Sequence, residues 1–217
     1  MQKSHEILKK VKDDYNTIAP YFSDTRNYNW SEFEEFKKYI KPEMRVLDLG
    51  CGNGRFYNFL ENFQIDYTGI DNSEEILKQA KNKHPDQIFK FGDILNIPEQ
   101  NNEFDIIFCI AALHHIPQEY RTDALIEIKR VLKPNGFFIM TNWNLWQKKY
   151  LPLILKSTFK KFGDVYIPWY TPEGKMIARR YYHAFTKMEL SRLAKKSNFK
   201  IIEQYYTKRN IVSIYKK

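Results

Sequence analysis

Short apolar runs alternate in the middle of the chain with stretches in which apolar residues recur every three or four positions. The short runs predict β-strands over 45–49, 66–71, 88–91, 104–110 and 137–141. The stretches between them predict helices over 54–62, 73–83 and 118–132. Strands that alternate with helices favour a parallel sheet with helices on both faces. The run over 104–110 is almost continuously apolar, so we expect that strand to be buried on both sides.

The N-terminal segment departs from this alternation. We expect helices over 4–14 and 31–39, the second opened by a capping-box pattern at Ser31, with an irregular aromatic stretch from Tyr15 between them. Residues 1–40 would therefore form a helical cap on the domain.

The C-terminal third departs in a different way. Residues 143–183 carry tryptophans, tyrosines and lysines without a clear period, and we interpret them as an insertion on the substrate side, because long irregular segments in compact domains are usually functional. A capping box at Thr186 predicts a helix to about Lys196. Apolar runs over 199–206 and 211–216 predict a closing hairpin with an antiparallel last strand.

Length and composition favour one domain over residues 1–217. The chain has 217 residues, 43% of them hydrophobic, which is enough for a core. We expect no membrane span, because no apolar run approaches the roughly 18 residues required. Two cysteines are too few for a disulfide framework or a cysteine zinc site, so we expect no metal and a cytoplasmic protein without a signal peptide.

Charge is distributed unevenly. The net charge is +9, yet residues 145–217 hold 17 Lys and Arg against 4 Asp and Glu, whereas residues 1–144 are slightly acidic. A basic final third indicates a polyanion partner for that part of the molecule. The alternative is a general lysine bias, but such a bias would affect both parts equally.

A glycine-rich turn follows the first predicted strand. Residues 46–54 read Val-Leu-Asp-Leu-Gly-Cys-Gly-Asn-Gly. These glycines allow a sharp turn and the close approach of a ligand, and the helix that follows directs its N–H groups toward that ligand. Asp71 stands 21 residues after Gly50, near the spacing at which a carboxylate meets a ribose. The pattern indicates a nucleotide-like ligand, with NAD as one candidate.

The glycine spacing is G-x-G-x-G, and together with Asp48 it resembles motif I of class I S-adenosylmethionine (SAM) methyltransferases. The resemblance implies a Rossmann-like α/β fold with a doubly wound, mostly parallel seven-stranded sheet, and SAM as cofactor. Asp93 and the short glycine spacing favour SAM over NAD. The implied cofactor-binding residues are Tyr21, Asp48, Gly50, Gly52, Asn53, Asp71, Asn72, Asp93, Ile94, Ile110 and Ala111.

The chain also resembles one subfamily, the tRNA methyltransferases that act on 5-carboxymethyluridine at the wobble position. The resembling pieces include an N-terminal signature over 15–26, a segment over 110–115, and the run Arg180-Tyr181-Tyr182-His183. The resemblance implies that the substrate is tRNA. Eukaryotic members work with a small zinc-binding activator subunit, which is a possible partner here.

The implied acceptor is a carboxymethyl group with a pKa of roughly 4, so it is an anion at neutral pH and needs no general base. The protein must instead supply cations and hydrogen-bond donors that orient the carboxylate. The candidates for this catalytic role are Arg26, His114, His115, Arg180, Tyr182 and His183. One of the two adjacent histidines is expected to be structural, and Tyr181 or Tyr182 to be a core aromatic residue.

RNA binding is assigned to the basic final third. The candidate phosphate contacts are Lys148, Lys149, Lys160, Lys161, Lys208 and Arg209. A flipped base could stack on Trp143 or Trp169. Two other functions stay open: methylation of a small acid or phenol, and a SAM-binding fold that acts without catalysis as a subunit of an RNA-processing complex.

Overall fold

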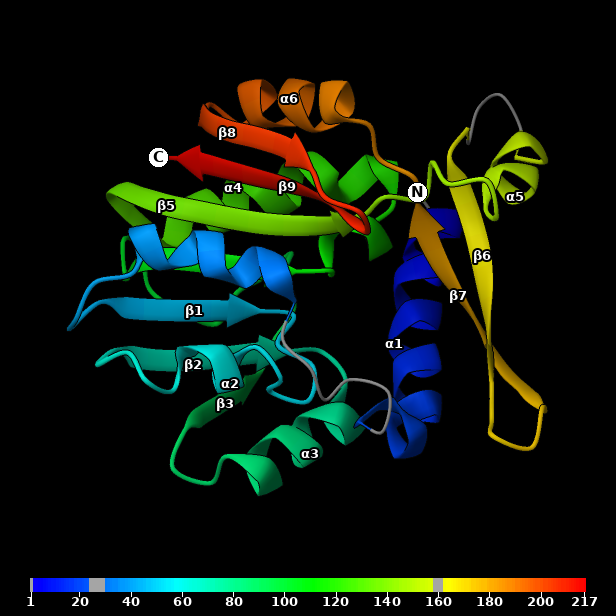
Figure 1. Cartoon of the computed structure of the whole chain (residues 1–217), viewed down its shortest axis with the longest axis horizontal. Helices are drawn as coiled ribbons and strands as arrows, with labels where there is room; N and C mark the ends of the chain where they lie inside the picture. The colour runs from blue at the N-terminus through cyan, green and yellow to red at the C-terminus, as the bar shows by residue number, and fades with distance from the viewer. Residues whose placement is uncertain (1, 24–29, 158–161) are drawn as a thin grey trace.

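The computed structural model of the chain describes residues 2–23, 30–157 and 162–217. Within them, the centre is a seven-stranded sheet in the order β3-β2-β1-β4-β5-β9-β8 (Figure 1). Its strands are β1 (Arg45–Leu49), β2 (Asp66–Asp71), β3 (Ile88–Phe91), β4 (Phe104–Ile110), β5 (Leu132–Trp143), β8 (Lys200–Tyr206) and β9 (Asn210–Lys216). Strands β1 to β5 are parallel, whereas β9 is antiparallel to both of its neighbours. The predicted sheet is confirmed.

Helices cover both faces of this sheet (Figure 1). One face carries η2 (Ser31–Tyr39), α2 (Tyr57–Leu60) and α3 (Glu74–Lys83), and the other carries α4 (Arg121–Val131) and α6 (Lys187–Lys196). Phe36, Leu60 and Leu77 are buried on the first face, and Leu125 and Leu190 are buried on the second. Each such side chain stabilises the fold by about 1.5–3 kcal/mol. The two cores therefore hold the ends of the parallel strands in place.

The first helix is longer than its sequence pattern predicts. Helix α1 runs from Gln2 to Phe22, so residues 15–22, which were expected to be irregular, are helical. Ile7, Val11 and Ile18 are buried along one side of it, and they pack against the inserted segment. This tertiary packing extends the helix, because packing of an apolar face contributes more to helix stability than propensity does.

The inserted segment contains regular structure that its sequence hides. Helix α5 (Leu151–Leu155) precedes an antiparallel hairpin of β6 (Asp164–Tyr170) and β7 (Met176–His183), which is separate from the large sheet. Figure 1 shows α1 standing between the carboxyl ends of the central strands and this hairpin. Residues 180–183 are all buried, so β7 lacks the apolar–polar alternation that identifies a strand.

Helix boundaries follow the caps that are available. Thr186 forms the predicted capping box of α6, and Ser73 caps α3. Residues 31–39 instead form a 3₁₀-helix without a side-chain cap, and the helix expected over 54–62 shortens to α2 because tight turns follow Gly54. None of the described helices combines the length and the apolar character needed to cross a membrane.

Candidate active site

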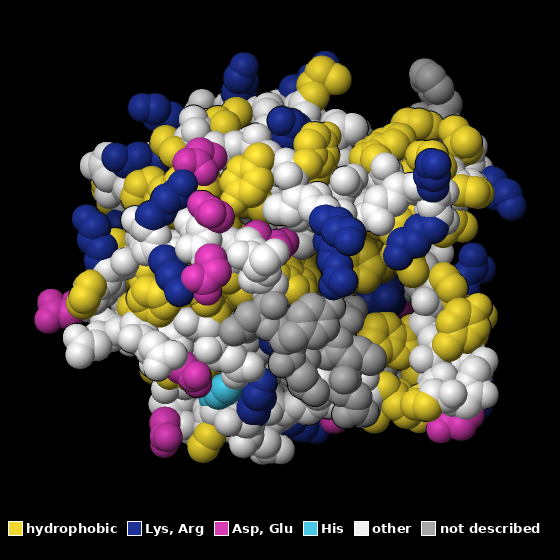
Figure 2. Space-filling view, in the orientation of Figure 1, with side chains coloured by type: hydrophobic (Ala, Val, Ile, Leu, Met, Phe, Trp, Pro, Cys, Tyr) yellow, Lys and Arg dark blue, Asp and Glu magenta, His cyan; other side chains and the backbone are white. Residues whose placement is uncertain are grey.

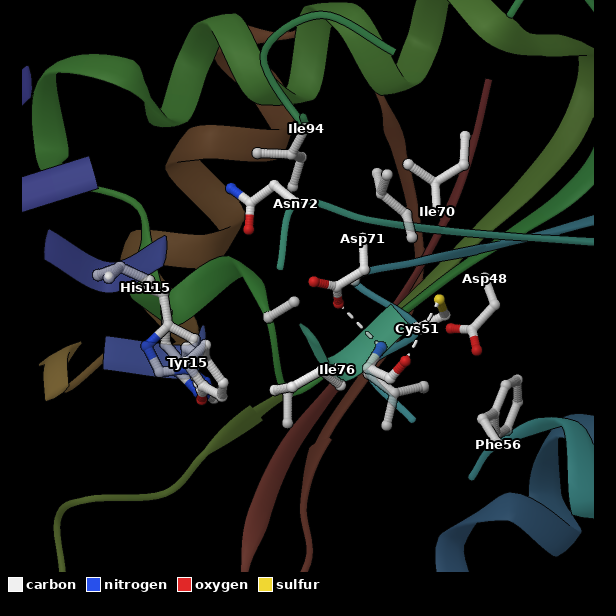
Figure 3. A pocket seen from close by; sticks show the side chains of 18 of the residues that line it. Tyr15, Asp48, Cys51, Phe56, Ile70, Asp71, Asn72, Ile76, Ile94 and His115 are labelled. Atoms are coloured by element: carbon white, nitrogen blue, oxygen red, sulfur yellow. Dashed lines mark hydrogen bonds between the residues drawn. The ribbon is translucent and has the colours of Figure 1, made fainter. Parts of the chain in front are cut away.

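A cavity lies at the carboxyl ends of β1, β2 and β4, and side chains of α1 and β7 complete its lining (Figure 3). It brings together most of the residues that the sequence analysis selected. They are Asp48, Gly50, Gly52, Asn53, Asp71, Asn72, Ile94, Ile110 and Ala111 from the cofactor set, and His114, His115, Arg180 and Tyr182 from the acceptor set. Tyr21, Asp93 and His183 do not line the cavity, and Arg26 lies outside the described residues.

The glycine turn is shaped by contacts that only glycine permits. Gly50 has a φ of 75°, and a Cβ on it would stand 2.5 Å from the Cβ of Ala112. The Gly50 and Cys51 amides both donate to the carbonyl of Ile70, at 2.7 and 3.1 Å. The turn is therefore held against both β2 and the segment that follows β4, and its backbone forms one wall of the cavity.

Asp71 joins the glycine turn to the start of α3. One carboxylate oxygen accepts from the Gly52 amide at 2.8 Å (Figure 3), and the other accepts from the Ser73 amide at 2.8 Å. Burial raises the pKa of Asp71, while these hydrogen bonds oppose that rise. A carboxylate can accept about four hydrogen bonds, so each oxygen retains capacity for a ligand hydroxyl. The geometry fits the two hydroxyls of a ribose.

Asp48 supplies a buried acceptor. It is 1% exposed, and its Oδ2 accepts from the Tyr67 hydroxyl at 3.0 Å. Its Oδ1 has no hydrogen-bond partner among the residues that the structure describes. Burial raises the pKa of Asp48 to about 7. A buried acceptor on the cavity wall that lacks a partner fits a cationic ligand group, such as the ammonium of an amino-acid moiety.

Asp93 influences the cavity through a hydrogen bond from Asn72. Its Oδ2 accepts from Nδ2 of Asn72 at 3.0 Å, and its Oδ1 accepts from the Leu95 amide at 2.9 Å. Asn72 and Ile94 line the cavity, but Asp93 does not. Asp93 thus fixes the orientation of Asn72 at the β2 and β3 ends of the site, and its predicted contact with an adenine amino group stays a prediction.

Helix α1 covers the cavity, and several residues of the N-terminal signature hold it in this position. The Tyr15 hydroxyl lies 2.7 Å from Nε2 of His115. Oδ1 of Asn16 accepts from the Ser73 hydroxyl at 2.7 Å, at the N-terminus of α3. The Ala19 carbonyl accepts from Nε2 of Gln79 at 2.5 Å. The signature residues therefore anchor α1 over the ends of the strands.

The run Arg180-Tyr181-Tyr182-His183 is divided between the two faces of β7. Arg180 and Tyr182 line the cavity, whereas Tyr181 and His183 face the opposite way. Arg180 is 4% exposed, and its guanidinium lies 4.6 Å from the Trp169 ring and 5.1 Å from the Tyr182 ring. The described part of the chain offers it no ion pair, and its Nε has no hydrogen-bond partner there.

The two adjacent histidines have different environments. Nδ1 of His115 lies 2.7 Å from the Tyr181 carbonyl, which can only accept, so Nδ1 carries the proton and Nε2 accepts from Tyr15. Nδ1 of His114 accepts from the Trp143 amide at 3.3 Å, so its proton is on Nε2. Burial lowers both pKa values, that of His115 to about 3. Both rings are neutral, and His115 is occupied by structural contacts.

An aromatic wall completes the acceptor end of the cavity. The rings of Tyr182, Trp143 and His114 form a triangle: Tyr182 stacks on Trp143 at a centroid distance of 5.1 Å and on His114 at 5.0 Å, and His114 lies 6.0 Å from Trp143. Tyr15 and Arg55 also line the cavity, although the sequence analysis assigned no role to either. For Arg55 the available signal was its position directly after the glycine turn. For Tyr15 the signal was its place in the N-terminal signature.

Basic side chains gather beside the cavity. Figure 2 shows Lys and Arg next to the hollow, over the region where α5 and the β8–β9 turn lie in Figure 1. Lys148, Lys149, Lys208 and Arg209 are exposed there, and the two segments are joined by a hydrogen bond from the Asn144 amide to the Arg209 carbonyl, 2.8 Å long. Lys160 and Lys161 lie outside the described residues. Within those residues, no cluster of His, Cys, Asp and Glu is suited to hold a metal ion.

Comparison with known proteins agrees with this geometry. Residues 47–140 match a family model described as a methyltransferase domain. A SAM-dependent methyltransferase from Methanosarcina mazei has the same fold, with a TM-score of 0.72, 23% identity, and coverage of 84% of this chain and 96% of that one. The fold and the site therefore define a class I SAM-dependent methyltransferase, and SAM is its cofactor.

Sequence relatives narrow the family. The chain is 31% identical over 221 residues to the tRNA (carboxymethyluridine(34)-5-O)-methyltransferase of Schizosaccharomyces pombe, with 92% of each chain covered. It is 33% identical to the Arabidopsis thaliana protein of the same name, over 72% of this chain and 40% of that longer protein. The chain belongs to the family of these methyltransferases.

One structural neighbour has a partner. It is a complex between the Haloferax volcanii Trm112 methyltransferase activator and a methyltransferase. The match has a TM-score of 0.69 and 16% identity, and it covers 95% of this chain and 96% of that one. At this identity the likeness concerns the fold alone.

Proposed function

We propose that this methyltransferase esterifies the carboxylate of 5-carboxymethyluridine at the wobble position of a tRNA. The observation that carries the proposal is Arg180, a buried guanidinium on the cavity wall that has no ion pair among the described residues. The Tyr15 hydroxyl and the more distant Asp14 carboxylate interact with this guanidinium, yet neither gives it an ion pair, and a buried cation is costly unless a ligand supplies the paired charge. The family's named substrate carries such a carboxylate.

The proposed chemistry depends on orientation. When bound, SAM supplies a methyl group on a sulfonium centre. Arg180 would hold the acceptor carboxylate through charge-assisted hydrogen bonds, and the Nε2 proton of His114 offers a second donor. The low pKa of each histidine makes its neutral imidazole a weak base that is poorly suited to abstract a proton, and no base is needed because the acceptor is already ionised. The aromatic wall excludes water from the two opposite charges.

RNA binding is proposed for the exposed basic residues beside the cavity. Lys148, Lys149, Lys208 and Arg209 would contact phosphates on either side of the flipped nucleotide, while Trp143 would stack on its base. In this proposal, residues 1–40 and 143–183 form the acceptor side of a single domain. A tRNA substrate also makes the cytoplasm the proposed compartment.

Two alternatives are weaker. A small acid or phenol would not need a cavity flanked by exposed lysines on two segments. A non-catalytic subunit would not need a cation on the acceptor wall, yet Arg180 is held there by three aromatic rings.

The experiment is labelled methyl transfer from SAM into tRNA purified from cells that lack this gene, followed by nucleoside mass spectrometry. We expect label in the methyl ester of 5-carboxymethyluridine. Label in another nucleoside, or in small molecules only, would reject the proposal. Bulk tRNA from cells that retain the gene is the control, because its sites are already methylated.

An activator subunit is a second part of the proposal. The Haloferax volcanii structure supports it, because a methyltransferase of this fold binds an activator there. The same assay with the purified chain alone, and then with a Trm112-type protein added, tests the requirement. We expect turnover to increase when the activator is present. Equal turnover in both assays would remove the activator from the proposal.

A further inference from the structure

A polar cluster of three buried and two partly buried side chains lies on the face of β7 that points away from the cavity. We name it the hairpin clamp and define it as Arg121, Asp164, Tyr181, His183 and Glu189. Nδ1 of His183 lies 2.7 Å from Oδ1 of Asp164, and its Nε2 lies 3.2 Å from Oε1 of Glu189. The clamp joins β6 and β7 to α4 and α6.

Each clamp member has several partners. Oδ1 of Asp164 also accepts from the Tyr181 hydroxyl at 2.9 Å and lies 3.7 Å from Nη2 of Arg121. Nε of Arg121 donates to the Ile116 carbonyl at 2.9 Å. Burial acts to raise the pKa of Glu189, but hydrogen bonds from His183 and from the Thr186 amide lower it to about 2. The cluster is thus electrostatically satisfied, and removing one member leaves buried charges unpaired.

The hairpin depends on attachments of this kind. A two-stranded hairpin is marginally stable at best without packing against other elements. Strands β6 and β7 pair with each other and with no strand of the central sheet in the described residues. Apolar contacts with α1 hold one side, through Tyr181 and Trp169. The clamp holds the end of the hairpin that carries Tyr182 and His183.

We propose that Asp164 and His183 are positioning residues that set where Arg180 and Tyr182 stand against the cofactor. Alternation along β7 connects the two roles, because residues 181 and 183 bind the clamp while 180 and 182 face the cavity. His183, which the sequence analysis placed among the substrate-orienting residues, acts through its neighbours in this arrangement. The acceptor role of Arg180 rests on the proposed function.

The test compares Asp164→Ala with Glu173→Ala in the full chain. Both variants remove one carboxylate from the hairpin, but Glu173 is exposed in its turn. We expect amide hydrogen exchange of β6 and β7 to accelerate about tenfold in Asp164→Ala, with β4 and β5 unchanged. The SAM dissociation constant should stay within about twofold, and kcat for tRNA should fall about tenfold at unchanged KM for SAM. Glu173→Ala should match the wild type.

A second, milder variant distinguishes loss of the clamp from general misfolding. Glu189→Gln keeps the Thr186 capping interactions and weakens the contact to His183, so it should show the same changes at smaller amplitude. Equal exchange of the hairpin in Asp164→Ala and Glu173→Ala would overturn the clamp. Uniform acceleration over the whole chain would also overturn it. Exchange and SAM affinity need no tRNA, so a wild type that stays inactive on tRNA even with the activator added would reject the proposed function and leave the clamp standing.

Discussion

The cofactor side and the acceptor side of the cavity are built in different ways. The cofactor side uses backbone amides of the glycine turn and two aspartates, Asp48 and Asp71, all within one short stretch of chain. The proposed acceptor side consists of side chains of Tyr15, His114 and Arg180, which come from three distant segments. Substitutions in the glycine turn therefore disturb the backbone that forms the cofactor side. Substitutions of the packed side chains can impair the acceptor side and leave cofactor binding intact.

The largest effect is expected from a variant that disrupts cofactor binding alone. Asp71→Ala should weaken SAM binding by at least about 100-fold, because it deletes the ribose acceptor and frees the Gly52 and Ser73 amides. Isothermal titration calorimetry measures this, with Asp86→Ala as a control on an exposed carboxylate. Unchanged affinity would disprove the assignment of Asp71 to the ribose.

The converse variant should affect the acceptor side alone. Arg180→Ala should lower kcat for tRNA methylation by at least about 100-fold, because it removes the cation that orients the carboxylate, and SAM affinity should be preserved. The control is Arg179→Ala, which removes an exposed arginine from the same strand. Single-turnover methylation and calorimetry together measure the separation, and retained turnover would move the acceptor site elsewhere.

Substituting one glycine in the glycine turn and one in the hairpin turn compares the two regions by their effect on the free energy of unfolding. Gly50→Ala should cost roughly 3 kcal/mol of unfolding free energy, since a left-handed alanine at φ 75° is strained and its Cβ meets Ala112. Gly174→Ala in the hairpin turn, at φ 84° with open space around it, should cost only about 1–2 kcal/mol. Urea unfolding measures both values. Equal costs would show that the glycine turn is not tightly packed.

Asp48 makes the cofactor side sensitive to pH. Because its pKa of about 7 exceeds the ordinary value of 3.8, the stability that it contributes is fully present below pH 3.8 and is lost as the pH rises through 7. In the proposed site only the ionised form binds the ammonium of SAM, so SAM affinity should rise roughly eightfold between about pH 6 and 7.5, in proportion to the ionised fraction of Asp48. Calorimetry across this range measures it. Asp48→Asn should flatten the profile, and an equally steep profile in that variant would refute the role.

The smallest effects are expected outside the cavity. The affinity for tRNA should fall steeply with salt, because phosphate contacts release counterions. Replacing both Lys148 and Lys149 with alanine should reduce the slope of log affinity against log salt by about 1.5. A matched double variant at Lys78 and Lys81, which are exposed on α3, should keep the slope. Equal slopes in both double variants would exclude this surface from RNA binding.

The sequence by itself determined the cofactor side. The strand before Gly50, the glycine turn and Asp71 are neighbours along the chain, so the spacing of residues dictates their geometry in space. The mostly parallel sheet with helices on both faces followed as well, because strands that alternate with helices along a chain form such a sheet; the order of its strands came from the structure.

Only the tertiary structure decided the acceptor side. The length of α1 depends on burial against the hairpin, and the hairpin itself has no alternating pattern because residues 180–183 are buried on both faces. Whether His183 faces the substrate or a pair of carboxylates depends on Asp164 and Glu189, which lie on other elements. Contacts between distant segments carry no local signal, because side-chain packing rather than backbone propensity determines them.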